Sequence, residues 1–167
     1  MTQCVGIDLT QGMVSEYNTS ARNQGIPESE MEAFVGNIID SKDANPSSLQ
    51  TERFFNFDIA VVGLGFHHFD DPALAAKRLT ERLKKGGVLM IVDFLPHAHH
   101  ETHSHAAAHT VTHMGFSEEQ VRKMFEDAGA GGGFDYTVVG KGIVFHGQKG
   151  GGEDMKRSVF MARGTKA

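Results

Sequence analysis

An acidic residue directly after a short apolar run is the first feature that could bind a ligand. Cys4 to Ile7 reads as a β-strand, Asp8 follows it, and Thr10 then fits the N-cap position of a helix. An ionised carboxylate there can accept two hydrogen bonds from a ribose diol, and bonds to a charged acceptor are strong. The simpler interpretation is an acid that caps the helix or faces solvent.

Two further stretches place polar residues or glycines at the ends of predicted strands. Asn37 follows a glycine, and its side-chain carbonyl can accept a hydrogen bond from an adenine amino group while Ile38 covers the adenine face. Asn37 is equally compatible with an ordinary turn. Gly63 and Gly65 allow a ligand to approach the backbone, but their spacing does not form the G-x-G-x-x-G dinucleotide fingerprint.

Histidine is abundant, with 10 residues, and seven of them lie between His97 and His113. Imidazoles bind zinc, nickel and copper, but this segment lacks the cysteines and the ligand spacing of a structural zinc site. We therefore assign no metal ligands and expect a solvated loop or a lid over a substrate pocket. Histidine also suits general-base catalysis near neutral pH. Three histidines qualify by position as catalytic candidates: His67, His97 and His109.

Composition bounds the class of protein. The 167 residues suit a single domain over 1–167, and the hydrophobic and charged fractions of 40% and 22% are typical of globular proteins. A net charge of -5 argues against a nucleic-acid surface, and a single cysteine excludes an internal disulfide. No apolar stretch reaches the roughly 20 residues of a membrane span, and the start has no signal-peptide pattern. We therefore expect a cytoplasmic protein.

Helices and strands are predicted to alternate along the chain. Apolar residues at helical spacing, with capping residues before them, predict helices over 11–24, 72–85 and 117–128. Apolar runs predict strands between these helices, and the runs at 59–62 and 88–94 suit strands buried on both faces. The predicted strands are 4–7, 31–39, 57–69, 88–94, 136–145 and 158–162.

This alternation predicts an α/β fold with helices on both faces of a doubly wound, mostly parallel sheet. The last two strands, separated by a glycine-rich loop, predict a C-terminal antiparallel hairpin. In such sheets ligands bind at the carboxyl ends of the strands. The residues singled out above lie at those ends.

Five stretches in order resemble the class I S-adenosylmethionine-dependent methyltransferases. They are "VGIDLTQGM", "FVGNIID", "FDIAVVGLGFHHFDDP", "LKKGGVLMIVDF" and "HTVTHMGFSEEQVRKMFEDAG". The resemblance implies a Rossmann-like fold that ends in an antiparallel hairpin, in agreement with the predicted tail. It also implies a transferase that uses S-adenosyl-L-methionine to methylate a small-molecule substrate, with no nucleic-acid or membrane partner.

The resemblance further implies which residues bind the cofactor. The acid after the first predicted strand would bind the ribose, the next strand end would hold the adenine, and the glycine after the third would line the methionine part. At Asn37 the family commonly has an Asp instead. A histidine base is not obligatory, because proximity and orientation can drive the reaction. The implied cofactor-binding residues are Asp8, Leu9, Met13, Asn37, Ile38, Gly63 and Leu64.

In the family a first strand and a glycine-rich turn precede the strand that ends at Asp8, whereas here Met1 stands directly before that strand. The resemblance therefore predicts a chain without the first, central strand of the sheet and truncated relative to the family. Sheet edges exposed by such a gap recruit other chains, so a homo-oligomer is one expected consequence. The alternative function is a non-catalytic, methyltransferase-like protein that acts as a partner or an oligomeric scaffold.

Overall fold

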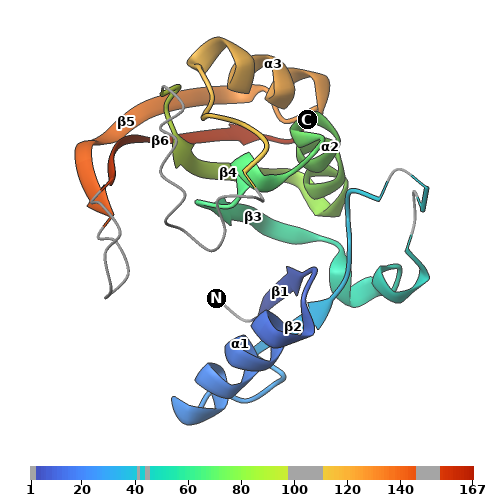
Figure 1. The fold of residues 1–167 in the computed structure, drawn as a ribbon. Helices are drawn as coiled ribbons and strands as arrows, with labels where there is room; N and C mark the ends of the chain where they lie inside the picture. Colours follow the sequence, from blue (N-terminus) through green and yellow to red (C-terminus); the bar gives the residue numbers. More distant parts are fainter. Residues whose placement is uncertain (1–2, 41, 44–45, 98–110, 146–154) are drawn as a thin grey trace. The chain divides into compact units, whose positions relative to one another are not determined.

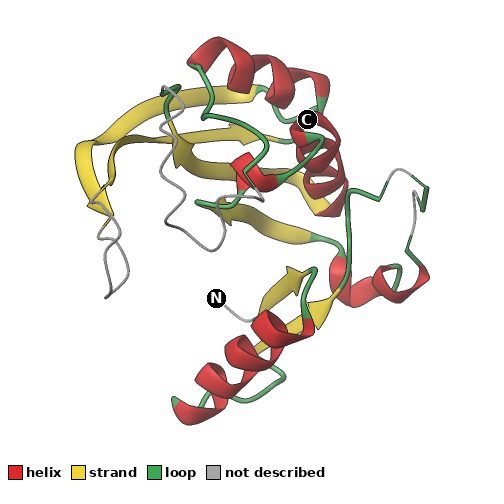
Figure 2. Ribbon diagram, in the orientation of Figure 1, coloured by secondary structure: helices red, strands yellow, loops and turns green. Residues whose placement is uncertain are grey.

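The structure is a computed structural model that describes residues 3–40, 42–43, 46–97, 111–145 and 155–167. The chain divides into two compact units, Met1–Phe54 and Phe55–Ala167, and each is described by itself (Figure 1). Helices and strands alternate through most of the chain, as Figure 2 shows by colour. Within the described ranges no helix is both long and apolar enough to cross a membrane.

The first unit is a parallel strand pair covered by a helix. β1 (Cys4–Asp8) pairs in parallel with β2 (Met31–Val35), and α1 (Gln11–Asn23) packs on both strands with Val14 and Ala21 buried. The side chain of Thr10 accepts a hydrogen bond from the backbone N–H of Met13. The predicted N-cap and helix are therefore confirmed.

β2 ends at Val35, although a strand was predicted over 31–39. The side chain of Asn37 accepts a hydrogen bond from the backbone N–H of Ile39 at 3.0 Å, and this local turn replaces further strand pairing. Two short 3-10 turns, Ser47–Leu49 and Glu52–Phe54, close the unit. They bring the buried Leu49 against Gly36 and set the Phe54 ring edge-on to Phe34.

The second unit is a four-stranded sheet in the order β3-β4-β6-β5. β3 (Phe57–Gly63) runs parallel to β4 (Leu83–Phe94). β6 (Met155–Thr165) is antiparallel to both β4 and β5 (Gly132–Phe145). The predicted C-terminal antiparallel hairpin is confirmed, with strands longer than the sequence pattern indicated.

α2 (Pro72–Arg82) and α3 (Glu118–Asp127) contact each other over one face of this sheet (Figure 1). That face is fully buried, as Leu89, Ile91, Phe160 and Ala162 show. The opposite face is not: Ile59 and Val61 of β3 are 42% and 53% exposed. The prediction that the apolar run 59–62 is buried on both faces is therefore wrong for these two side chains, because both helices lie on the other face.

Helix capping agrees with the sequence, whereas one helix end does not. Asp71 accepts from the backbone N–H of Leu74, and Ser117 and Gln120 form the reciprocal capping box that begins α3. α2 was predicted to continue to 85, but it ends at Arg82. The backbone is extended from the next residue, Leu83, which pairs with Phe57. Strand pairing thus overrides the helical pattern of the last residues.

Candidate functional site

Asp8 is the last residue of β1, and its carboxylate stabilises the turn that leads into α1. Oδ1 accepts hydrogen bonds from the backbone N–H and the hydroxyl of Thr10, at 2.8 Å and 3.0 Å. Within the described part of the chain no group bonds Oδ2, so this oxygen keeps its lone pairs for a ligand. Beside it, the apolar side chains of Leu9 and Met13 are 60% and 59% exposed. Asp8 therefore bonds the N-cap residue of α1 through Oδ1, and its Oδ2 has no bond to a described group.

Asn37 and Ile38 lie directly after β2 and are both half-buried. The Oδ1 atom of Asn37 accepts from the N–H of Ile39, which is the turn role that the sequence also allowed. A carbonyl oxygen has two lone pairs, so this bond leaves room for one more donor. The parallel pairing of β1 with β2, with Asp8 opposite Val35, puts both strand ends at the same edge of this sheet.

The end of β3 has an unusual backbone. Gly63 is exposed with open space around its Cα, and Leu64 follows with a positive φ of 53°. The N–H of Leu64 donates to the carbonyl oxygen of Val92 at 2.8 Å, which fixes this conformation. Left-handed backbone is costly for a leucine, and such strain clusters at functional sites.

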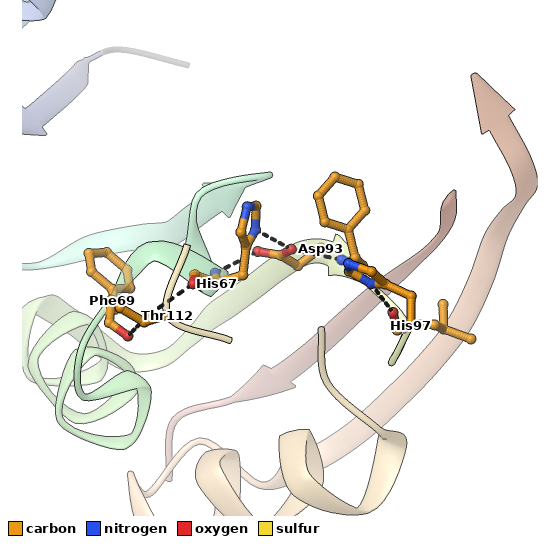
Figure 3. A network of polar contacts seen from close by, with 7 residues as sticks. His67, Phe69, Asp93, His97 and Thr112 are labelled. Carbon is orange, nitrogen blue, oxygen red and sulfur yellow. Dashed lines mark hydrogen bonds and ion pairs between the residues drawn. The ribbon is translucent and has the colours of Figure 1, made fainter. Parts of the chain in front are cut away.

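His67 and Asp93 form a buried pair in the second unit (Figure 3). His67 lies on a short 3-10 turn, Phe66–His68, that follows β3, and Asp93 lies near the end of β4. Nδ1 of His67 is 2.7 Å from Oδ1 of Asp93, and the two side chains are 7% and 0% exposed. The sheet pairing of β3 with β4 therefore brings together two residues that are 26 positions apart.

Thr112 stabilises the 3-10 turn of His67 through hydrogen bonds to backbone carbonyl oxygens. Its backbone N–H donates to the carbonyl oxygen of His67 at 3.1 Å, and its hydroxyl lies 3.0 Å from that oxygen and 2.9 Å from the carbonyl of Phe69 (Figure 3). The N–H of His113 also donates to the His67 carbonyl, at 3.1 Å. The backbone of His67 is thus bonded on both sides.

His97 and His67 both lie next to the ring of Phe94. The ring centroid of His97 is 6.0 Å from the ring of Phe94, which in turn is 5.0 Å from the His67 ring. Nδ1 of His97 donates to the carbonyl oxygen of Leu95 at 3.1 Å. The structure thus brings two of the three catalytic candidates to one aromatic ring, whereas His109 lies outside the described residues.

From the sequence, neither Asp93 nor Thr112 was assigned a role. The signal for Asp93 was its place at the carboxyl end of a predicted strand, where ligands bind in parallel sheets. Nothing in the spacing of the sequence indicated which histidine it would meet. In the described ranges no group of three or more His, Cys, Asp and Glu side chains is arranged to hold a metal ion.

Comparison with known proteins gives the family. The sequence profile of the family described as "Methyltransferase domain" matches residues 1–130. An uncharacterized methyltransferase of Schizosaccharomyces pombe is 28% identical over 144 residues, which cover 83% of this chain and 48% of that protein. The chain thus spans about half the length of the curated relative that it matches.

Solved structures agree on the fold. YcgJ from Bacillus subtilis superimposes with a TM-score of 0.68 at 16% identity, covering 99% of this chain and 82% of that one. A SAM-dependent methyltransferase from Thermotoga maritima gives a TM-score of 0.57 at 21% identity, covering 98% and 72%. These similarities confirm the α/β class that the alternation of elements predicted and the Rossmann-like fold that the family resemblance implied. Because the profile matches well over half of the sequence, this chain belongs to the methyltransferase domain family.

Proposed function

We propose that the chain is an S-adenosylmethionine-dependent methyltransferase that acts on a small-molecule acceptor. Membership of the methyltransferase domain family supports the reaction class, and a similar fold carries a SAM-dependent enzyme in Thermotoga maritima. When bound, S-adenosylmethionine supplies a methyl group on a positively charged sulfur. The acidic composition, with a net charge of -5, favours a small acceptor over a nucleic acid.

The observation that supports the proposal most directly is the Oδ2 atom of Asp8, which no described group bonds. Oδ1 is occupied by Thr10, whereas Oδ2 is available to accept from ribose hydroxyls. Leu9 and Met13, both more than half exposed, offer apolar surface next to the acid. This combination of a charged acceptor and apolar side chains fits a nucleoside.

The remaining cofactor assignments follow the same logic within each unit. Asn37 would accept from the adenine amino group with the second lone pair of Oδ1, and Ile38 would cover the ring. In the second unit Gly63 leaves open space at the backbone, and Leu64, 39% exposed, would contact the methionine part. His67, His97 and His109 are the proposed candidates for a base that receives the acceptor's proton.

Isothermal titration calorimetry of the full chain with S-adenosylmethionine tests the cofactor assignment. Asp8→Asn keeps an acceptor oxygen for Thr10 but removes the charge. We expect it to weaken binding by about 1.5–3 kcal/mol, the range for hydrogen bonds to charged groups, which is roughly 10- to 160-fold in Kd. Asp71→Asn is the matched control, because Oδ1 of Asp71 also accepts a backbone N–H at the start of a helix. It should leave the Kd unchanged.

Two results would count against the proposal. Equal affinities of wild type and Asp8→Asn would remove Asp8 from the ribose site. A wild-type chain that binds neither S-adenosylmethionine nor S-adenosylhomocysteine would contradict the cofactor itself. Formation of S-adenosylhomocysteine in the presence of a panel of phenols, amines and thiols measures the transferase activity directly.

A further inference from the structure

Asp93 is the one fully buried acid among the described residues, and it lies near the carboxyl end of β4. A buried carboxylate is tolerated only when it is paired and hydrogen-bonded. Three N–H groups provide these hydrogen bonds to the Asp93 carboxylate. The backbone N–H of Phe94 and Nδ1 of His67 both lie 2.7 Å from Oδ1, and the backbone N–H of His67 lies 3.1 Å from Oδ2.

This environment assigns the tautomer of His67. The backbone donors require acceptor oxygens on both sides of the carboxylate, so Nδ1 of His67 is the donor in the 2.7 Å contact. A neutral imidazole with its hydrogen on Nδ1 carries a lone pair on Nε2. No described group bonds Nε2, which therefore remains available as a proton acceptor.

The ring is held in place as well as oriented. The centroid of the His67 ring lies 4.1 Å from that of His68 and 5.0 Å from that of Phe94. The carbonyl oxygen of His67 accepts from the N–H groups of Thr112 and His113. A buried, oriented imidazole with one unbonded nitrogen is the arrangement that a general base needs.

We propose that Asp93 is a positioning residue that holds His67 in the Nδ1–H form, so that Nε2 receives the proton of the acceptor. The inference rests on the proposed function and narrows its acceptors to compounds that are methylated on an O–H or N–H group. Thiols that ionise by themselves do not need such a base, and carbon acceptors without an acidic proton cannot use it.

The step balances in atoms and charge. The lone pair of the acceptor oxygen or nitrogen forms the bond to the methyl carbon, and the carbon–sulfur bond breaks with its electron pair left on sulfur. The acceptor's proton passes to Nε2 of His67. The imidazolium that results is stabilised by the Asp93 carboxylate across the 2.7 Å contact. The proton returns to solvent after the product leaves.

The first test reads the tautomer directly and needs no substrate. The full chain is labelled with 15N-histidine, and nitrogen–proton correlation spectra show which ring nitrogen of each neutral histidine carries the hydrogen. The signals of His67 are assigned by their absence in His67→Gln. We expect the Nδ1–H form in the wild type, and an Nε2–H form would overturn the proposal.

Asp93→Asn then tests the positioning role. Its side-chain amide can donate to Nδ1, which favours the opposite tautomer with the hydrogen on Nε2. We expect His67 to shift toward that form, a change that a merely structural role of Asp93 would not produce. An unchanged tautomer in folded Asp93→Asn would contradict the positioning role. If this variant does not fold, the wild-type spectrum still decides the tautomer.

The second test compares acceptors. Phenol, aniline and thiophenol serve as probes, because thiophenol loses its proton at neutral pH without help. His67→Gln should lower the methylation rate of phenol by about 100-fold or more, as expected for loss of a general base, and change that of thiophenol little. The loss with aniline should fall between these two, because its neutral nitrogen already carries a lone pair. Asp71→Asn, the control already used for cofactor binding, should stay close to wild type with every probe.

Equal losses with all three probes in His67→Gln, or a wild type that methylates only thiophenol, would overturn the assignment. Calorimetry separates this failure from failure of the proposed function. His67→Gln should bind S-adenosylmethionine as the wild type does, because the proposed cofactor residues are unchanged. Absence of cofactor binding by the wild type would contradict the proposed function, whereas the tautomer result stands independently of it.

Discussion

The side chain of Asn18 bonds the backbone of Ala33 as a neighbouring strand would. Its Nδ2 donates to the carbonyl oxygen of Ala33 at 3.0 Å, and its Oδ1 accepts from the Ala33 N–H at 2.7 Å. Ala33 lies in the middle of β2, and these two groups face away from β1. Open strand edges recruit other chains. Asn18, from α1, therefore satisfies one edge position of this sheet within its own unit.

Asn18→Ala should lower the free energy of unfolding by about 1–3 kcal/mol, because Ala33 is buried and would lose both partners. Urea denaturation measures the loss, and faster amide exchange at Ala33 localises it. Asn23→Ala, in the exposed last turn of the same helix, is the matched control and should cost far less. Equal effects of the two substitutions would show that the bonds to Ala33 contribute nothing.

Leu64→Gly should relieve backbone strain at the end of β3. The φ of 53° is available to glycine at little cost and disfavours leucine by about 1 kcal/mol. The Leu64 side chain is 39% exposed, so its removal sacrifices limited burial. Leu64→Ala removes the same side chain but keeps the strain. We expect Leu64→Gly to be the more stable of the two in urea denaturation, while both bind S-adenosylmethionine more weakly if Leu64 contacts the cofactor.

Gly115 and Gly129 form a second matched pair. Both have positive φ, 87° and 79°, but a Cβ on Gly115 would clash with the carbonyl oxygen of Leu95, whereas a Cβ on Gly129 would meet nothing within 4 Å. Gly129→Ala should therefore cost only the backbone strain, about 1 kcal/mol. Gly115→Ala should cost clearly more, because the chain must move away from the end of β4. Thermal and urea unfolding of both variants test the difference, and equal costs would contradict it.

Local patterns in the sequence were sufficient to predict most elements. Thr10, Asp71 and the Ser117–Gln120 pair begin helices as predicted, because capping depends on residues within one turn. The end of α2 was wrong because pairing of Leu83 with Phe57 is a long-range effect. The exposure of Ile59 and Val61 was missed for a similar reason, since an apolar run does not reveal which face the helices will cover.

The candidate site was also predictable only in part. The positions of Asp8, Asn37 and Gly63 at strand ends follow from the order of strands and helices, and the structure agrees with each. The contact of His67 with Asp93 depends on the register of β3 against β4 and on the 3-10 turn after β3. Neither has a signature in a single sequence, which is why Asp93 was not assigned a role there.

Tyr17 should make the stability of the protein fall at alkaline pH. Burial, together with a hydrogen bond and charge interaction with Cys4, raises the pKa of Tyr17 from 10.0 to about 12. The folded chain therefore holds this proton more tightly than the unfolded chain. The stabilisation is complete below pH 10 and is lost as the pH rises from there to about 12. Tyr17→Phe should flatten this part of the unfolding free energy profile.

A spectrophotometric titration isolates the group, because the chain has 2 tyrosines. In Tyr136→Phe only Tyr17 gives the tyrosinate absorbance, and we expect its midpoint near the pKa of about 12. Adding Cys4→Ala removes two of the three causes of the shift but leaves the burial, so the pKa of Tyr17 should fall and still stay above 10.0. A midpoint at 10.0 in folded Tyr136→Phe would show that Tyr17 is solvated and that β1 and α1 do not pack as described.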